Sequence, residues 1–186
     1  MPYYLFELMR IYKKRKMGKE KDYIAWQNRA TYYYIASRLL ALNKIWPPAV
    51  FCGQQALENL LKATLIYWDK SFHPIKDPIK ACHNFPKMLR IIRNKVPNSA
   101  NINIPENFYY EKRYQESSRY PISGKDLLFL GDFLNDLDEA FYSLLVLVPF
   151  QFNSVLSNIF KKNKPQVKIL RKKNNQIRKI KKFLLK

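Results

Sequence analysis

Three polar side chains with complementary chemistry, Gln55, Glu58 and Lys62, recur at spacings of three and four residues. On an α-helix these spacings place them along one face, where Glu58 and Lys62 can form an i, i+4 ion pair. An amide, a carboxylate and an ammonium on one face can bind a nucleotide or a partner helix. They can equally form a solvated helix surface, on which the ion pair contributes about 0.2 to 0.5 kcal/mol. The sequence leaves both interpretations open.

A fourth candidate for ligand binding is Arg119, which comes just before Tyr120 and Pro121. A proline disfavours helical backbone before it, so this segment is expected to be extended between two helices. A guanidinium held there can bind a phosphate through two hydrogen bonds. It can also cap helix carbonyls or join a buried ion pair. With the three residues above, Arg119 completes the candidate ligand-binding set.

The remaining candidate for chemistry is His83, which stands beside Asn84 at the start of a predicted helix. It can act as a general base, or it can cap or pack the helix. No nucleophile stands at a spacing that fits a catalytic pair. A zinc site would have to combine His83 with Cys52, His73 and Cys82, whose spacing is unusual for zinc. We therefore predict a polar or structural role for His83, no catalytic residue and no metal site, with Cys52 a small core residue.

Glycine and cysteine usage excludes several classes of protein. The four glycines of the 186 residues are isolated from one another and form no Gly-rich loop, so P-loop and Rossmann nucleotide sites are excluded. Two cysteines cannot build a disulfide framework. The longest stretch without a charge or an amide, 140–150, is shorter than the roughly 18 residues that span a bilayer. We expect a cytoplasmic protein without a secretory signal, because the basic residues 13–16 follow the N-terminal apolar stretch.

The net charge of +20 is concentrated at the two ends of the chain. Residues 161–186 carry +12 and residues 1–21 carry +5, whereas residues 22–160 carry only +3. The chain is 47% hydrophobic, too apolar for a disordered polycation. We therefore predict a basic N-terminal extension over residues 1–21, a helical domain over 22–148 and a basic tail over 149–186.

The elements that position the candidate residues are predicted to be helices, because apolar residues recur every three or four positions. The first predicted helix spans 22–42, and the second spans 49–68 after two prolines suited to its first turn. The inward-facing residues expected on these two helices are Ile24, Thr31, Ile35, Leu39 and Leu42, then Cys52, Ala56, Leu60 and Ala63.

Three further helices are predicted downstream. The first begins near Asn84, a short one covers 106–118, and a long one follows a capping-box-like Ser123 and ends near Pro149. Their expected inward-facing residues are Met88, Leu89, Ile92 and Val96, then Phe108, Tyr110 and Tyr114, then Leu127, Leu130, Leu134, Leu137, Phe141 and Leu144. These patterns predict an all-α, up-and-down bundle of four main helices plus one short helix, with a basic C-terminal tail.

The basic tail also contains a seven-residue repeat of Leu170, Ile177 and Leu184, with Ile180 and Phe183 beside it. Such a pattern can form a basic amphipathic helix that binds nucleic acid or, less favoured, lies on a membrane surface. The alternative is a disordered, solubilising tail. The candidate polyanion-binding residues are Lys161, Lys162, Lys168, Arg171, Lys172, Lys173, Arg178, Lys179, Lys181 and Lys182.

Three ordered motifs give the chain a family resemblance: the helix segment 54–63 (QQALENLLKA), the pair His83 and Asn84 followed by Leu89, and the turn 119–121 (RYP). Over residues 22–146 the chain resembles the HEPN domain family, named for a nucleotide-binding domain of higher eukaryotes and prokaryotes. Two positions depart from the family's Thr-His-x-Leu pattern: Cys82 stands before His83, and Phe85 stands where Leu is usual.

This resemblance implies a helical bundle that is often a homodimer and is frequently paired with a small nucleotidyltransferase. One branch of the family is ribonucleolytic and uses an Arg that is separated from a His by four to six intervening residues. No Arg has that spacing here; Lys76 is the nearest match to His83, and Lys lacks the bidentate fork of Arg.

We therefore expect a nucleotide- or partner-binding module that acts with a nucleotidyltransferase, uses no cofactor other than a nucleotide ligand, and binds RNA or DNA through its tail. The alternatives are a divergent ribonuclease toxin and a structural subunit with a nucleic-acid-binding tail.

Overall fold

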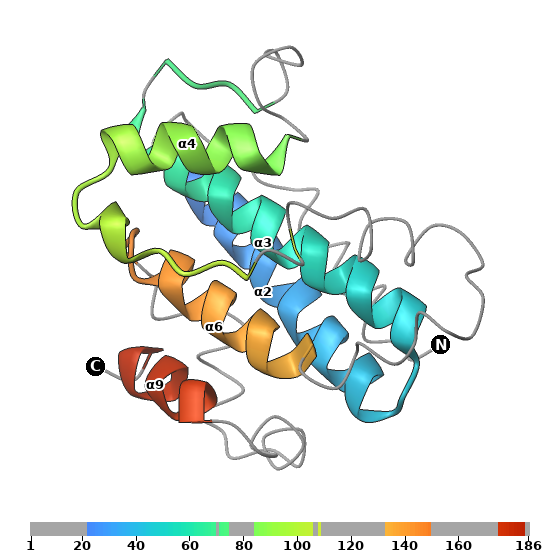
Figure 1. Ribbon diagram of the computed structural model, residues 1–186. Coiled ribbons are helices and arrows are strands. Elements are labelled where there is room, and N and C mark those ends of the chain that lie inside the picture. The colour runs from blue at the N-terminus through green and yellow to red at the C-terminus, as the bar shows by residue number, and fades with distance from the viewer. Residues whose placement is uncertain are drawn as a thin grey trace.

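The computed structural model describes residues 22–69, 71–74, 84–105, 108, 133–149 and 175–184. Their elements are the helices α2 (Asp22–Leu42), α3 (Trp46–Trp68), α4 (Phe85–Lys95), α6 (Phe133–Leu145) and α9 (Asn175–Leu184), with a short 3-10 turn, η2, at Ser99–Asn101. Figure 1 shows α2, α3 and α6 as the centre of the bundle, with α4 and α9 on opposite sides. The predicted all-α bundle is confirmed.

The longest helices, α2 and α3, pair as an antiparallel hairpin along most of their length (Figure 1). The three-residue turn between them places Lys44 in the left-handed backbone region, with a φ of 60°. The helix α3 begins three residues earlier than predicted, at Trp46, and its first turn contains Pro47 and Pro48. Proline is tolerated there because the N–H groups of the first helical turn have no partner within the helix. A hydrogen bond of 2.6 Å from the Ser37 hydroxyl to the carbonyl of Ala49 joins the two helices near this turn.

The prediction for the inward face of α2 held only in part. Of the five residues expected there, Thr31 is buried and Ile35 is half-buried against the core, whereas the other three are half-buried and lie outside the core cluster. The face that α2 turns to the core consists of Gln27, Ala30, Thr31, Tyr34, Ser37, Arg38 and Ala41. Several of these are polar, so hydrophobic periodicity could not reveal the buried side of the helix.

The prediction for α3 held for Ala56, Leu60 and Ala63, which are buried, whereas Cys52 is half-buried. Gly53 marks the closest approach of α3 to its neighbours. A Cβ atom there would lie 2.9 Å from Phe133 Cζ of α6 and 3.1 Å from Ser37 Oγ of α2. A glycine is therefore needed where the three helices meet.

The helix α4 begins as predicted. The Asn84 side chain accepts a hydrogen bond of 2.9 Å from the backbone N–H of Lys87, which caps the helix N-terminus. Met88, Leu89 and Ile92 are buried, and so is Val96 directly after the helix. The loop that follows continues into the core through Ile102 and Ile104.

The helix α6 buries Leu137, Phe141 and Leu144, as predicted, and ends four residues before Pro149. The first part of that predicted helix and most of the predicted helix over 106–118 lie outside the described residues, except for Phe108, which is buried. Against α6 packs α9, whose Ile180 has no exposed surface. Within the described residues, every helix is too short or too polar to cross a membrane.

Candidate functional site

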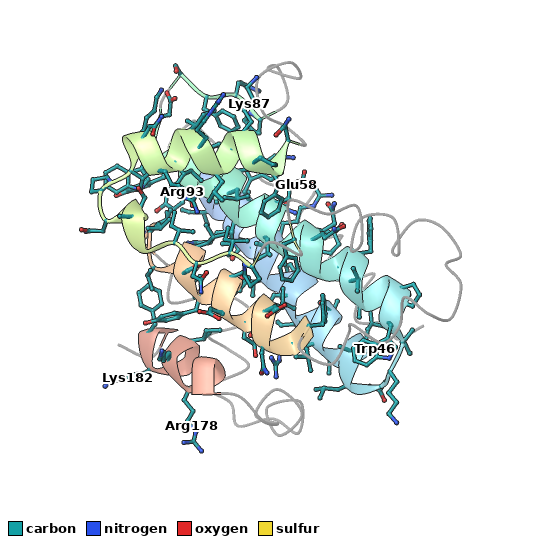
Figure 2. The ribbon with its side chains drawn as sticks, in the orientation of Figure 1. Trp46, Glu58, Lys87, Arg93, Arg178 and Lys182 are labelled. Atoms are coloured by element: carbon teal, nitrogen blue, oxygen red, sulfur yellow. The ribbon has the colours of Figure 1, made fainter. Side chains whose placement is uncertain are left out.

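The predicted polar strip of α3, formed by Gln55, Glu58 and Lys62, is largely buried. Lys62 donates a hydrogen bond of 2.6 Å to Glu58 Oε1, so the expected ion pair is present. Lys62 is only 5% exposed and Gln55 is half-buried, so the interpretation as a solvated surface is wrong. Figure 2 labels Glu58 near the middle of the bundle. Burial strengthens the electrostatic interactions of the charges in this strip, since water screens them less.

A second helix contributes to this strip through Trp26 of α2. The Lys62 ammonium lies 4.9 Å from the centroid of the Trp26 ring, a cation–π distance. Sequence reasoning missed Trp26, because only the pairing of α2 with α3 brings the ring to the lysine. The strip thus joins a cation, a carboxylate, an amide and an aromatic face.

The strip also borders a buried amide, that of Asn59. Its Nδ2 donates to the carbonyl of Gln55 at 2.5 Å. Within the described part of the chain, its Oδ1 atom is buried and accepts no hydrogen bond. A buried acceptor without a hydrogen bond lowers the free energy of unfolding. Asn59 directly follows Glu58 in α3.

A second polar cluster, which the sequence did not predict, is fully buried between α2 and α6. Tyr34 donates a hydrogen bond of 2.6 Å to Asp138 Oδ1, and Arg38 donates to the other carboxylate oxygen, Oδ2. All three side chains have no exposed surface. The Tyr34 ring also stacks on Phe141, with centroids 3.9 Å apart. Such a cluster fixes the two helices to each other and offers no surface to a ligand.

Burial and charge together shift the pKa of Tyr34. Desolvation by burial, and then the negative charge of Asp138, hold the pKa of its hydroxyl well above the usual value of about 10. The hydroxyl therefore stays a neutral donor to Asp138. The pKa of the Cys52 thiol is also raised by burial, which suits a core residue and disfavours a nucleophile.

The helix α9 has one buried side and one basic side. Ile180 is completely buried and Phe183 is half-buried, whereas Arg178, Lys179 and Lys182 are exposed. Figure 2 shows Arg178 and Lys182 pointing away from the bundle. We call the exposed Arg178, Lys179 and Lys182 the basic face of α9. Residues 175–184 of the basic tail thus form a helix whose apolar side packs against α6.

Several predicted site residues lie outside the described residues: Arg119, His83, Lys161, Lys162, Lys168, Arg171, Lys172, Lys173 and the side chain of Lys181. The structure therefore brings together Gln55, Glu58 and Lys62, and separately Arg178, Lys179 and Lys182. The two groups belong to different helices, α3 and α9, with α6 in contact with both.

Comparison with known proteins supports the family assignment. No curated protein and no solved structure matches the chain. The HEPN domain matches residues 23–140, a span that runs from the start of α2 into α6 and covers more than half of the chain. This span contains the polar strip of α3 and ends before the basic face of α9. The chain therefore belongs to the HEPN domain family.

Proposed function

We propose that this HEPN-family chain is a binding module that attaches to the phosphates of RNA or DNA through the basic face of α9. The observation that supports this most directly is the contrast within one helix, where Ile180 is buried and the three cations are exposed. An anchored helix holds its charges in a fixed pattern, so less conformational freedom is lost on binding.

The charge of the whole chain favours the same ligand class. A net charge of +20, with 12 cations and no acid in residues 161–186, creates a field that attracts polyanions. Each phosphate that a lysine or arginine neutralises releases counterions, and this release drives binding at low salt. Binding of this kind is expected to be nearly independent of sequence for duplexes.

The test is a salt titration of duplex binding. Arg178→Ser combined with Lys182→Ser removes two cations from α9 but leaves Ile180 in place. The log–log salt slope of affinity for a short duplex should become shallower by about one per lost phosphate contact, and affinity should fall. The matched control, Arg90→Ser with Arg93→Ser, removes two exposed cations from α4, on the other side of the bundle (Figure 1). An equal loss in both variants, or no loss in the α9 variant, would contradict the proposal.

The proposal includes no RNA cleavage, because the sequence has no Arg that precedes either His with four to six residues between them. The purified protein should leave single-stranded RNA intact over hours at neutral pH. Cleavage that survives repurification and disappears in His83→Ala or Arg119→Ala would instead favour the divergent ribonuclease.

A second candidate function is nucleotide binding at the polar strip of α3. Trp26 favours it, since an aromatic face beside a cation is a combination that binds a base and its phosphate. Glu58 accepts one of the three N–H groups of Lys62. A nucleotide that binds there should lose about tenfold or more in affinity in Lys62→Ala, and Arg119→Ala tests whether the second cation takes part.

The family assignment supports one further part of the proposal, a small nucleotidyltransferase as partner of a homodimeric HEPN subunit. Co-expression followed by size-exclusion chromatography with light scattering measures both the homodimer and the complex. If the protein is monomeric and never co-elutes with such an enzyme, this part of the proposal fails and only the nucleic-acid function remains.

A further inference from the structure

A cavity of about 250 Å³ lies beside the basic face of α9, between α6, α9 and the loop that follows α4. The residues that line it include Asn98, Asn103, Glu139, Tyr142, Val146 and Lys179. Drug-sized ligands occupy pockets of about 300 to 1,000 Å³. This cavity is therefore of a size for one flat ring, such as a single nucleobase, and not for a large cofactor.

The two charged residues of the cavity come from different helices and have opposite signs. Glu139 belongs to α6, and its Oε1 accepts a hydrogen bond of 2.6 Å from Asn103 Nδ2, which fixes the carboxylate. Lys179 belongs to α9 and is exposed. A carboxylate repels phosphate but accepts hydrogen bonds from the exocyclic amino groups of bases, as from the N4 amino group of cytosine. These two charges suit a ligand that has an amino-bearing base toward Glu139 and a phosphate toward Lys179.

Two other side chains suit a base. The half-buried Tyr142 provides an aromatic ring, and aromatic rings stack on unpaired bases at roughly 1 to 3 kcal/mol per base. Asn98 is exposed with a left-handed φ of 60°, and its carboxamide forms no hydrogen bond that caps η2. That carboxamide has both donors and an acceptor for a base edge.

We propose that this cavity, formed by Glu139, Tyr142, Asn98 and Lys179, binds one unpaired nucleobase with an exocyclic amino group while the adjoining backbone lies along the basic face of α9. This inference rests on the proposed function and adds to it a contact with the base that only single-stranded nucleic acid can make. Lys182 is one helical turn from Lys179, so a second phosphate along the strand has a cation within reach. A base within a duplex is stacked and paired and cannot enter the cavity.

The experiment compares two ligands that differ only at the base edge. Ten-residue oligomers of cytidine and uridine have equal charge and similar rings, but only cytosine has an amino group. Fluorescence anisotropy at one salt concentration should show about tenfold or greater preference for the cytidine oligomer, the value of one hydrogen bond to a charged acceptor. The ratio of the two affinities is independent of general changes in charge.

Two variants locate the preference in the cavity. Val146 lines the cavity and is 43% exposed, so Val146→Trp fills the space without disturbing the core. Glu139→Ala removes the proposed acceptor. Both should reduce the ratio to about one. Ile45→Trp places the same ring at a residue that is 48% exposed and does not line the cavity, so it should keep the wild-type ratio.

The outcomes separate this inference from the proposed function. If wild-type protein binds both oligomers equally, or if Val146→Trp and Glu139→Ala keep the preference, the cavity does not read the base and the inference is overturned. In that case the salt-dependent duplex binding of α9 can still stand. If no nucleic acid binds at all, the proposed function fails and the inference fails with it.

Discussion

At the scale of single residues, the ion pair of Arg38 and Asp138 is the interaction whose loss should cost most. Asp138→Ala removes the carboxylate from a guanidinium that has no exposed surface, and breaking such a pair costs about 3 to 5 kcal/mol. As a control, Lys95→Ala breaks the pair of Lys95 and Asp69, in which the lysine is 54% exposed, and should cost less than about 1 kcal/mol. Urea denaturation measures both. Equal losses of unfolding free energy in the two variants would contradict the prediction that a buried ion pair costs more to break than an exposed one.

The Tyr34 hydroxyl gives the same cluster a pH dependence. Its pKa is raised in the folded protein, so below about pH 10 the hydroxyl is neutral in both states and its contribution is fully present. Above pH 10 the unfolded chain ionises first, and the free energy of unfolding should fall as pH rises. Tyr34→Phe should make this alkaline decline shallower. It should also cost about 1 to 3 kcal/mol near pH 8, because Asp138 loses a buried donor.

Denaturation in urea at pH 8 and pH 10.5 measures this effect. Burial also raises the pKa of Cys52, which adds a decline of the same sign. Both proteins should therefore carry Cys52→Ala, so that their difference reports Tyr34 alone. An identical pH dependence with and without the hydroxyl would show that Tyr34 does not contribute.

At the scale of elements, the attachment of α9 depends on Ile180. Ile180→Ala removes buried methyl groups from the contact with α6, a change that costs about 2 to 5 kcal/mol in a well-packed core. A ten-residue helix is marginal without its packing, so α9 should open locally before the bundle unfolds. Hydrogen exchange should become faster in 175–184 and stay slow in α2 and α3. As a control, Lys182→Ala at an exposed position should leave hydrogen exchange in α9 nearly unchanged. If α9 stays protected from hydrogen exchange in Ile180→Ala, contacts other than that of Ile180 attach the helix to the bundle.

At the scale of the whole molecule, a net charge of +20 should make stability depend on salt. Like charges repel more strongly in the compact state than in the extended chain, and salt screens that repulsion within about 10 Å at 0.1 M. The melting temperature should therefore rise between about 0.02 and 0.3 M sodium chloride, whereas nucleic-acid affinity falls over the same range. Arg178→Glu with Lys182→Glu lowers the net charge by four and should reduce the rise. A melting temperature that falls with salt would show that favourable ion pairs outweigh the repulsion.

The sequence alone was sufficient wherever burial follows apolar periodicity. The start and inward face of α4 were predicted from Asn84 and the spacing of Met88, Leu89 and Ile92, because a side-chain cap and an apolar stripe are local properties. The all-α architecture followed from the same patterns, whereas the family resemblance came from the ordered motifs at 54–63, 83–84 and 119–121. The pair of Glu58 and Lys62 was also predictable, since both residues stand on one helix at a spacing of four.

The tertiary structure decided which residues of different helices contact one another. From the sequence, Arg38 is expected at the surface, but it forms an ion pair in the core with Asp138, which is 100 positions away. Trp26 contacts Lys62 only because α2 pairs with α3. The cavity between α6 and α9 likewise combines Glu139 and Lys179, which no local pattern connects. Sequence by itself determined that α2, α3, α4 and α6 are helical and how charge is distributed, because both depend on nearby residues. The buried side of α2 and the contacts that form each candidate site depend on packing between segments distant in sequence, and only the tertiary structure fixed them.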